Sequence, residues 1–158
     1  MRTRLCIALG VLLASAGAGA QLPVEIHRNQ PELLPSAAAT LTANKKLVFD
    51  FWREVVQAHR VERAPDYIAE GYVDHDPSVA TDRAAFIDRA RQLQPAPMKD
   101  TVDNLVALVA ERDLVVLAFR RTLPDLEHEG QTYATTWFDM FRVADGKIVE
   151  HWNYGTRD

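Results

Sequence analysis

An acid, an imidazole and an amide lie close together near the C-terminus, in two segments rich in aromatic residues. Asp139 follows Trp137 by two positions, and His151 and Asn153 lie in the next segment. A carboxylate among apolar side chains is costly to bury unpaired, and such groups are enriched at functional sites. Because imidazole titrates near neutral pH, we predict His151 as the general acid or base, with Asp139 as its catalytic partner. Asn153 would orient a substrate or stabilise an oxyanion, while Trp137 lines the binding cavity. The alternative is an Asp139–His151 pair with a structural role only.

A second group of polar residues, Tyr72 to Pro77, lies in a predicted loop between two predicted helices. His75 lies between Asp74 and Asp76, but adjacent residues in an extended segment point apart, and no His-x-x-x-His pair supports them. We therefore predict no metal site. His75 is expected to point into the cavity mouth and bind a polar group of a ligand, with Tyr72 beside it. The alternative for His75 is a helix-capping turn.

The rest of the sequence excludes several classes of chemistry. It has no glycine-rich phosphate loop and no nucleophile elbow, so we expect no cofactor. Its one cysteine, Cys6, lies in the N-terminal apolar run, which leaves no thiol for catalysis or metal binding elsewhere. The formal net charge is −4, without a basic stripe, which argues against nucleic acid and anionic membranes as partners.

The N-terminus has the features of a signal peptide. Arg2 and Arg4 precede a short apolar run, and small residues end at Ala20, where we predict cleavage and hence export to the periplasm or the medium. The apolar run is shorter than the ~20 residues that span a bilayer, so the mature form should not be anchored in a membrane. Residues 21–40 contain three prolines and no periodic pattern, which predicts a flexible leader before a single domain at 41–158.

Helices are predicted before strands. A helix from Leu41 presents an apolar face, a short helix covers 64–70 with Gly71 as its C-terminal cap, and a third runs from Thr81 or Asp82 to about Leu93. Four strands follow, at 102–110, 114–123, 131–143 and 148–154. Helices followed by antiparallel strands indicate an α+β fold.

The turn between the last two strands decides which side chains share a face. A two-residue turn at Asp145-Gly146 pairs Ala144 with Lys147. A three-residue loop pairs Val143 with Lys147 and needs positive φ only at Gly146, so we favour it. One face then carries the cavity residues Trp137, Asp139, Phe141, Val149, His151 and Asn153. The other carries Phe138, Met140, Arg142, Ile148, Glu150 and Trp152, an apolar surface suited to a homodimer contact.

Several motifs together resemble SnoaL-like (polyketide cyclase-like) proteins of the NTF2-like superfamily. They are Lys45-Lys46-Leu47-Val48, Ala64-Pro65-Asp66-Tyr67-Ile68, Tyr72-Val73-Asp74-His75-Asp76-Pro77, Phe138 to Val143, and Asp145 to Trp152. The resemblance implies a cone, in which a curved antiparallel sheet and about three N-terminal helices surround a cavity, and which is often dimeric. Members include polyketide cyclases, steroid isomerases and epoxide hydrolases.

Two positions compare informatively with this family. The cyclase-like members typically have Asp where this chain has Asn153, and an amide cannot exchange a proton near neutral pH. Asp139 matches the carboxylic acid in the oxyanion hole of ketosteroid isomerases. The resemblance thus implies a cofactor-free enzyme acting by acid/base chemistry on a small apolar carbonyl compound. The alternative is a non-catalytic module of the same fold that binds a small ligand or a partner.

Overall fold

The computed structural model describes residues 23–154 of the 158-residue chain. The predicted signal peptide and its cleavage site therefore lie outside the described residues. Within the described range, no helix is both long enough and apolar enough to span a membrane.

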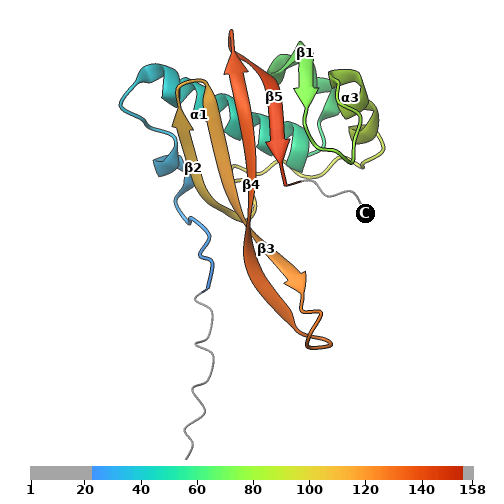
Figure 1. Cartoon of the computed structure of the whole chain (residues 1–158). Coiled ribbons are helices and arrows are strands. Elements are labelled where there is room, and N and C mark those ends of the chain that lie inside the picture. The colour runs from blue at the N-terminus through green and yellow to red at the C-terminus, as the bar shows by residue number, and fades with distance from the viewer. Residues whose placement is uncertain (1–22, 155–158) are drawn as a thin grey trace, which may run out of the picture.

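A five-stranded sheet forms the body of the molecule (Figure 1). Its order is β1-β5-β4-β3-β2, antiparallel throughout except for the parallel pair of β1 and β5. The β3–β4 hairpin is much longer than its neighbours and extends beyond the rest of the sheet as an arm (Figure 1). The strands are β1 (Ile68–Asp74), β2 (Leu105–Glu111), β3 (Leu114–Pro124), β4 (Thr132–Ala144) and β5 (Lys147–Asn153).

Helical segments cover one face of this sheet, which confirms the predicted α+β class (Figure 1). Phe51 of α1 is buried at the centre of the contact, with its ring centroid 5.9 Å from those of Phe86 and Phe141 and 6.0 Å from that of Tyr67. Asp82, one of the two predicted starting residues, caps α3 by accepting a hydrogen bond from the backbone N–H of Ala85. The helical segments are η1 (Gln30–Leu33), α1 (Ala39–Phe51), the π-helical η2 (Trp52–Gln57), η3 (Val61–Arg63), α2 (Ala64–Tyr67) and α3 (Arg83–Ala90).

The predicted second helix is wrong beyond Tyr67. The segment from Ile68 to Asp74 is instead strand β1, which adds an edge to the sheet by pairing in parallel with β5. Tyr72 and Asp74 are buried while Val73 between them is exposed, the alternation expected of a strand. Pairing with β5 stabilises this segment more than one further helical turn would, because a helix this short is marginal by itself.

The predicted loop of the last hairpin is also wrong, but the predicted cavity residues still lie on one face of the sheet. Asp145 (φ 50°) and Gly146 (φ 69°) form the two-residue turn, so Ala144 pairs with Lys147. A register shift then occurs at Val149, and from there Phe141 pairs with His151. The extra residue restores the same alternation. Ile148 is the exception, because it pairs with Val143 and is buried in the core rather than on the outer face.

The described part of the predicted leader packs against the domain. The side chain of Gln30 is buried, donating to the carbonyl of Val102 at 2.7 Å and accepting from its N–H at 2.7 Å. The Lys45 ammonium of α1 donates to the carbonyls of Leu33 and Pro35, at 2.6 and 3.0 Å. These contacts join the segment before α1 to both the sheet and the helix layer.

Candidate functional site

His151 bridges two buried carboxylates on the helix-covered face of the sheet. Its Nδ1 lies 3.1 Å from Oδ1 of Asp74, and its Nε2 lies 3.0 Å from Oδ1 of Asp139. Both aspartates are 3% exposed. The ring of Phe141 stacks on the imidazole, with centroids 4.6 Å apart. β1, β5 and β4 each supply one member of the Asp74–His151–Asp139 triad, so sheet pairing fixes its geometry.

A second layer of polar groups holds Asp74. The Tyr72 hydroxyl donates to its Oδ2 at 3.3 Å, and the backbone N–H of Asp76 donates to its Oδ1 at 3.1 Å. One guanidinium nitrogen of Arg89 lies 3.9 Å from Oδ2. Burial, followed by the charge of Asp74, raises the pKa of Tyr72, which therefore keeps its proton and acts as a donor.

The two carboxylates change the ionisation of the imidazole. Burial lowers the pKa of His151, but the hydrogen bonds and charges of Asp139 and Asp74 outweigh burial and raise it to about 9. Burial raises the pKa of Asp74, yet the hydrogen bond and charge of His151 outweigh it and hold this pKa below its usual range. At neutral pH His151 is therefore an imidazolium that donates both N–H groups.

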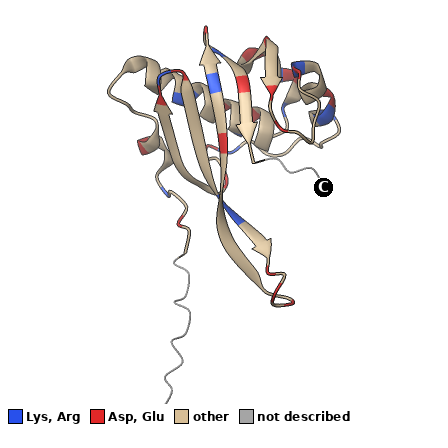
Figure 2. Ribbon diagram, in the orientation of Figure 1, with Lys and Arg blue, Asp and Glu red and all other residues tan. Residues whose placement is uncertain are grey.

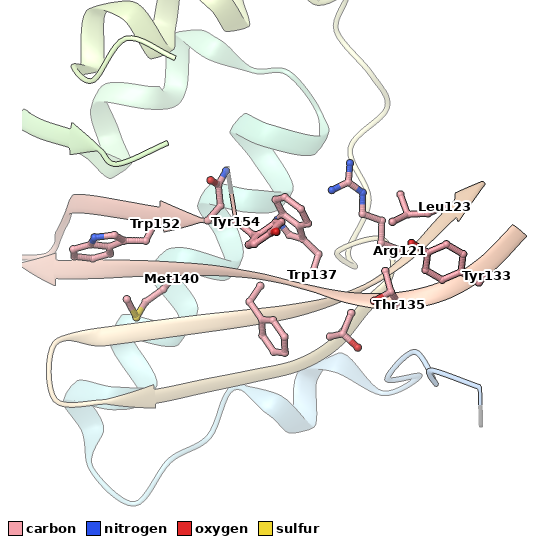
Figure 3. A pocket seen from close by; sticks show the side chains of 11 residues that line it. Arg121, Leu123, Tyr133, Thr135, Trp137, Met140, Trp152 and Tyr154 are labelled. Atoms are coloured by element: carbon pink, nitrogen blue, oxygen red, sulfur yellow. The ribbon is translucent and has the colours of Figure 1, made fainter. Parts of the chain in front are cut away.

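Two cavities border this triad, and a third adjoins them at Asn153. The smallest, about 180 Å³, is bordered by all three triad residues and by Arg89. It shares Trp52, Asp139 and Asn153 with a second cavity of about 530 Å³. A third, of about 550 Å³, lies beside the arm and shares Arg121, Trp137 and Asn153 with the second (Figure 3). The two larger volumes lie in the range of small-molecule sites, ~300–1,000 Å³.

Asn153 lies where all three cavities meet, directly opposite Asp139 in the pairing of β4 with β5. Its Nδ2 donates to Oδ2 of Asp76 at 3.2 Å. Its Oδ1 is buried without a hydrogen-bond partner among the described residues. Asp76 thus engages one of the two N–H donors of this amide.

The remaining predicted residues are placed differently. Trp137 lines the two larger cavities, as expected of a wall residue. His75 instead lies on the outer face of the sheet, where its ring stacks on Trp152 at 4.8 Å and its Nε2 lies 3.0 Å from Glu150 Oε2. It points away from the cavity because Asp74, one position earlier in the extended chain, points in.

The sequence analysis missed the second carboxylate of the triad. Asp74 lies in the segment predicted as a loop, in which the sequence suggests no role for it beyond metal binding. An alternation of Tyr72, Asp74 and Asp76 is visible in the sequence, and reading 68–74 as a strand would have placed Tyr72 and Asp74 on one face. Among the described residues, no group of acids, histidines or cysteines has the arrangement of a metal site.

Comparisons with known proteins agree with this architecture. The SnoaL-like domain family matches residues 48–151, which is most of the chain and includes all three residues of the triad. The chain belongs to the SnoaL-like domain family. Among curated proteins, none matches the chain with significant similarity.

Solved structures of this family's fold resemble the chain at low sequence identity. A candidate polyketide cyclase from Acidithiobacillus ferrooxidans is 23% identical, with a TM-score of 0.52 over 75% of this chain and 89% of that one. A candidate SnoaL-like polyketide cyclase from Jannaschia is 16% identical, with a TM-score of 0.52 over 76% and 90%. An LEH-like epoxide hydrolase from M. tuberculosis is 13% identical, with a TM-score of 0.51 over 72% and 83%. At these identities the likeness establishes the NTF2-like fold.

Proposed function

We propose that this SnoaL-like protein is an exported, cofactor-free enzyme that moves a proton in enol or aldol-type chemistry on a small apolar carbonyl compound. The observation that carries the proposal is the buried Asp74–His151–Asp139 triad at a cavity with aromatic walls. Burying two carboxylates and an imidazole is costly, and such clusters are enriched at catalytic sites. Related cyclases and an epoxide hydrolase share the fold, so acid/base chemistry is within its range.

Within the triad, Asp139 is the group suited to act as the base. It uses Oδ1 to accept from His151 and borders two cavities, so Oδ2 is its oxygen able to meet a substrate. His151 keeps its proton at neutral pH, and its two N–H groups hold both carboxylates in place. It is therefore a positioning residue that also balances their charge, rather than the base itself.

The proposed step transfers one proton. Asp139 takes the proton from the carbon next to the substrate carbonyl, and the electron pair of that C–H bond moves to the carbonyl oxygen to give an enolate. Arg89 borders the small cavity and supplies positive charge near the enolate oxygen. The protonated Asp139 then returns the proton to another carbon of the enolate, giving an isomer. Alternatively the enolate attacks a second carbonyl carbon, and Asp139 returns the proton to the resulting alkoxide, giving an aldol product.

Substitution of Asp139 tests this function directly. We expect Asp139→Asn to keep the fold but lower kcat on an enolisable substrate by roughly a hundredfold or more, because the amide cannot accept the proton. His151→Gln should lower it also, by releasing Asp139. The control is His128→Gln, which removes an imidazole–carboxylate pair in the exposed β3–β4 loop and should leave kcat unchanged.

The Asn153→Asp variant distinguishes the enzyme hypothesis from that of a non-catalytic binding module. It places a second carboxyl beside Asp76, where the two groups can share a proton and so supply an acid. We expect it to raise turnover on aldol substrates. A wild-type protein that is inert on a broad panel of carbonyl compounds, yet thermally stabilised by apolar ligands, would instead support the binding module.

A further inference from the structure

Arg121 is a cation without an acidic partner at the base of the arm. Its guanidinium carbon lies 4.3 Å from the centroid of the Trp137 ring, and the side chain is exposed. Among the residues that the structure describes, it has neither an ion pair nor a side-chain hydrogen bond, whereas Arg142 on the outer face binds both Asp113 and Glu150. The aromatic ring orients the guanidinium but leaves its N–H donors free.

The position of Arg121 relative to the cavities is specific. Arg121 and Trp137 both border the 530 Å³ cavity and the 550 Å³ cavity. In Figure 3 the guanidinium lies beside Trp137, with Leu123 and Tyr133 farther along the arm. If Arg121 binds the anionic group of a ligand, the rest of that ligand would therefore lie against apolar and aromatic walls.

Sheet register gives the separation between this cation and the triad. Arg121 pairs with Thr135, and Asp139 lies four positions farther along β4. At ~3.4 Å per residue, the two positions are about 14 Å apart along the strand. Figure 2 shows positive residues where β3 enters the arm, whereas the triad end of the cavities carries the three carboxylates of Asp74, Asp76 and Asp139 against the two cations Arg89 and His151. This separation of charge favours one orientation of a ligand, with its anionic end toward the arm.

We propose that Arg121 is the binding residue for the carboxylate of an elongated apolar substrate, whose opposite, uncharged end reaches Asp139. The inference rests on the proposed function for the reacting end of the substrate only. The anchoring end stands on the unpaired guanidinium, its aromatic support and the two cavities that it borders. The substrate class is thus an apolar acid that carries its carbonyl group far from its carboxylate.

Binding of decanoate and of its uncharged methyl ester tests the proposal. Titrations of the mature chain followed by tryptophan fluorescence should show decanoate binding about tenfold more tightly than methyl decanoate, because only the acid forms the charge-assisted hydrogen bonds. Arg121→Gln should abolish this preference and leave binding of the ester unchanged. The matched control, Arg112→Gln, removes the same charge in the β2–β3 turn and should retain the preference.

Every other outcome is decisive. Equal binding of acid and ester by the wild type, or binding of neither, overturns the proposal, as does an Arg121→Gln protein that still prefers the acid. Loss of the preference in Arg120→Gln but not in Arg121→Gln would show that Arg120 binds the carboxylate, which also overturns the proposal. Asp139→Asn should retain the preference, so failure of the catalytic proposal leaves a different signature from failure of this one.

Discussion

At the scale of single residues, the buried charged groups of the site are arranged around one histidine. His151 is held between two carboxylates on different strands and against the ring of Phe141. Because its pKa rises from 6.5 to about 9 on folding, protonation of His151 is linked to the stability of the folded chain. The same side chain that organises the site therefore contributes to the fold.

This linkage predicts a loss of stability at alkaline pH. A raised folded-state pKa contributes stability that is fully present below pH ~6.5 and disappears as the pH rises through ~9, with a size of about 3 kcal/mol. The lowered pKa of Asp74 acts in the opposite sense, contributing above its unfolded value of 3.8 and being lost in acid. Urea unfolding of the wild type should therefore become easier between pH 6.5 and 9.

The control for this prediction is His151→Gln. It should be less stable than the wild type at pH 6 and should show a much flatter pH dependence between pH 6.5 and 9. A wild-type profile that is flat over this interval would contradict the raised pKa. A variant profile as steep as that of the wild type would assign the linkage to another group.

At the scale of elements, sequence periodicity predicted the parts with a long, regular pattern and failed where tertiary pairing decides. The long strands and α3 with its Asp82 cap are confirmed. β1 was missed because only pairing with β5 separates it from a helical extension of α2. Because β1 was missed, Asp74 was not predicted as a site residue. Because the register shift at Val149 was missed, the turn was predicted wrongly. Neither long-range pairing nor a bulge has a local sequence signal strong enough to predict it.

The segment before α1 yields a prediction at this scale. Gln30→Met keeps the length of the side chain but leaves the N–H and carbonyl of Val102 buried without their partners. We expect the free energy of unfolding to fall by about 2 kcal/mol, the usual cost of unsatisfied buried polar groups. Urea unfolding measures it, with the exposed Glu32→Gln in the same turn as control. An unchanged stability would mean that this segment contributes nothing to the fold.

At the scale of the whole molecule, the two faces of the sheet differ, although the 550 Å³ cavity beside the arm reaches the outer face, where Phe138, Met140 and Trp152 line it. The inner face carries the triad beneath the helices. On the outer face, cross-strand pairing aligns apolar side chains over four strands, since Val109 pairs with Val116, Val116 with Met140, and Met140 with Trp152. Phe138 lies on the same face and is 55% exposed, and Val109 is 56% exposed.

An apolar row of this kind, on a sheet face that residues 23–154 leave exposed, is typical of a contact surface, and we propose that two copies of the chain associate through it. Met140 lies within the row, so Met140→Glu would bury a charge without a partner at the interface while leaving the inner core intact. Sedimentation velocity at micromolar concentration should show a dimer for the wild type and a folded monomer for Met140→Glu. Gln92→Glu, which adds the same charge after α3, should remain a dimer. A monomeric wild type would refute the association, and a Met140→Glu protein that remains dimeric would move the interface to another face.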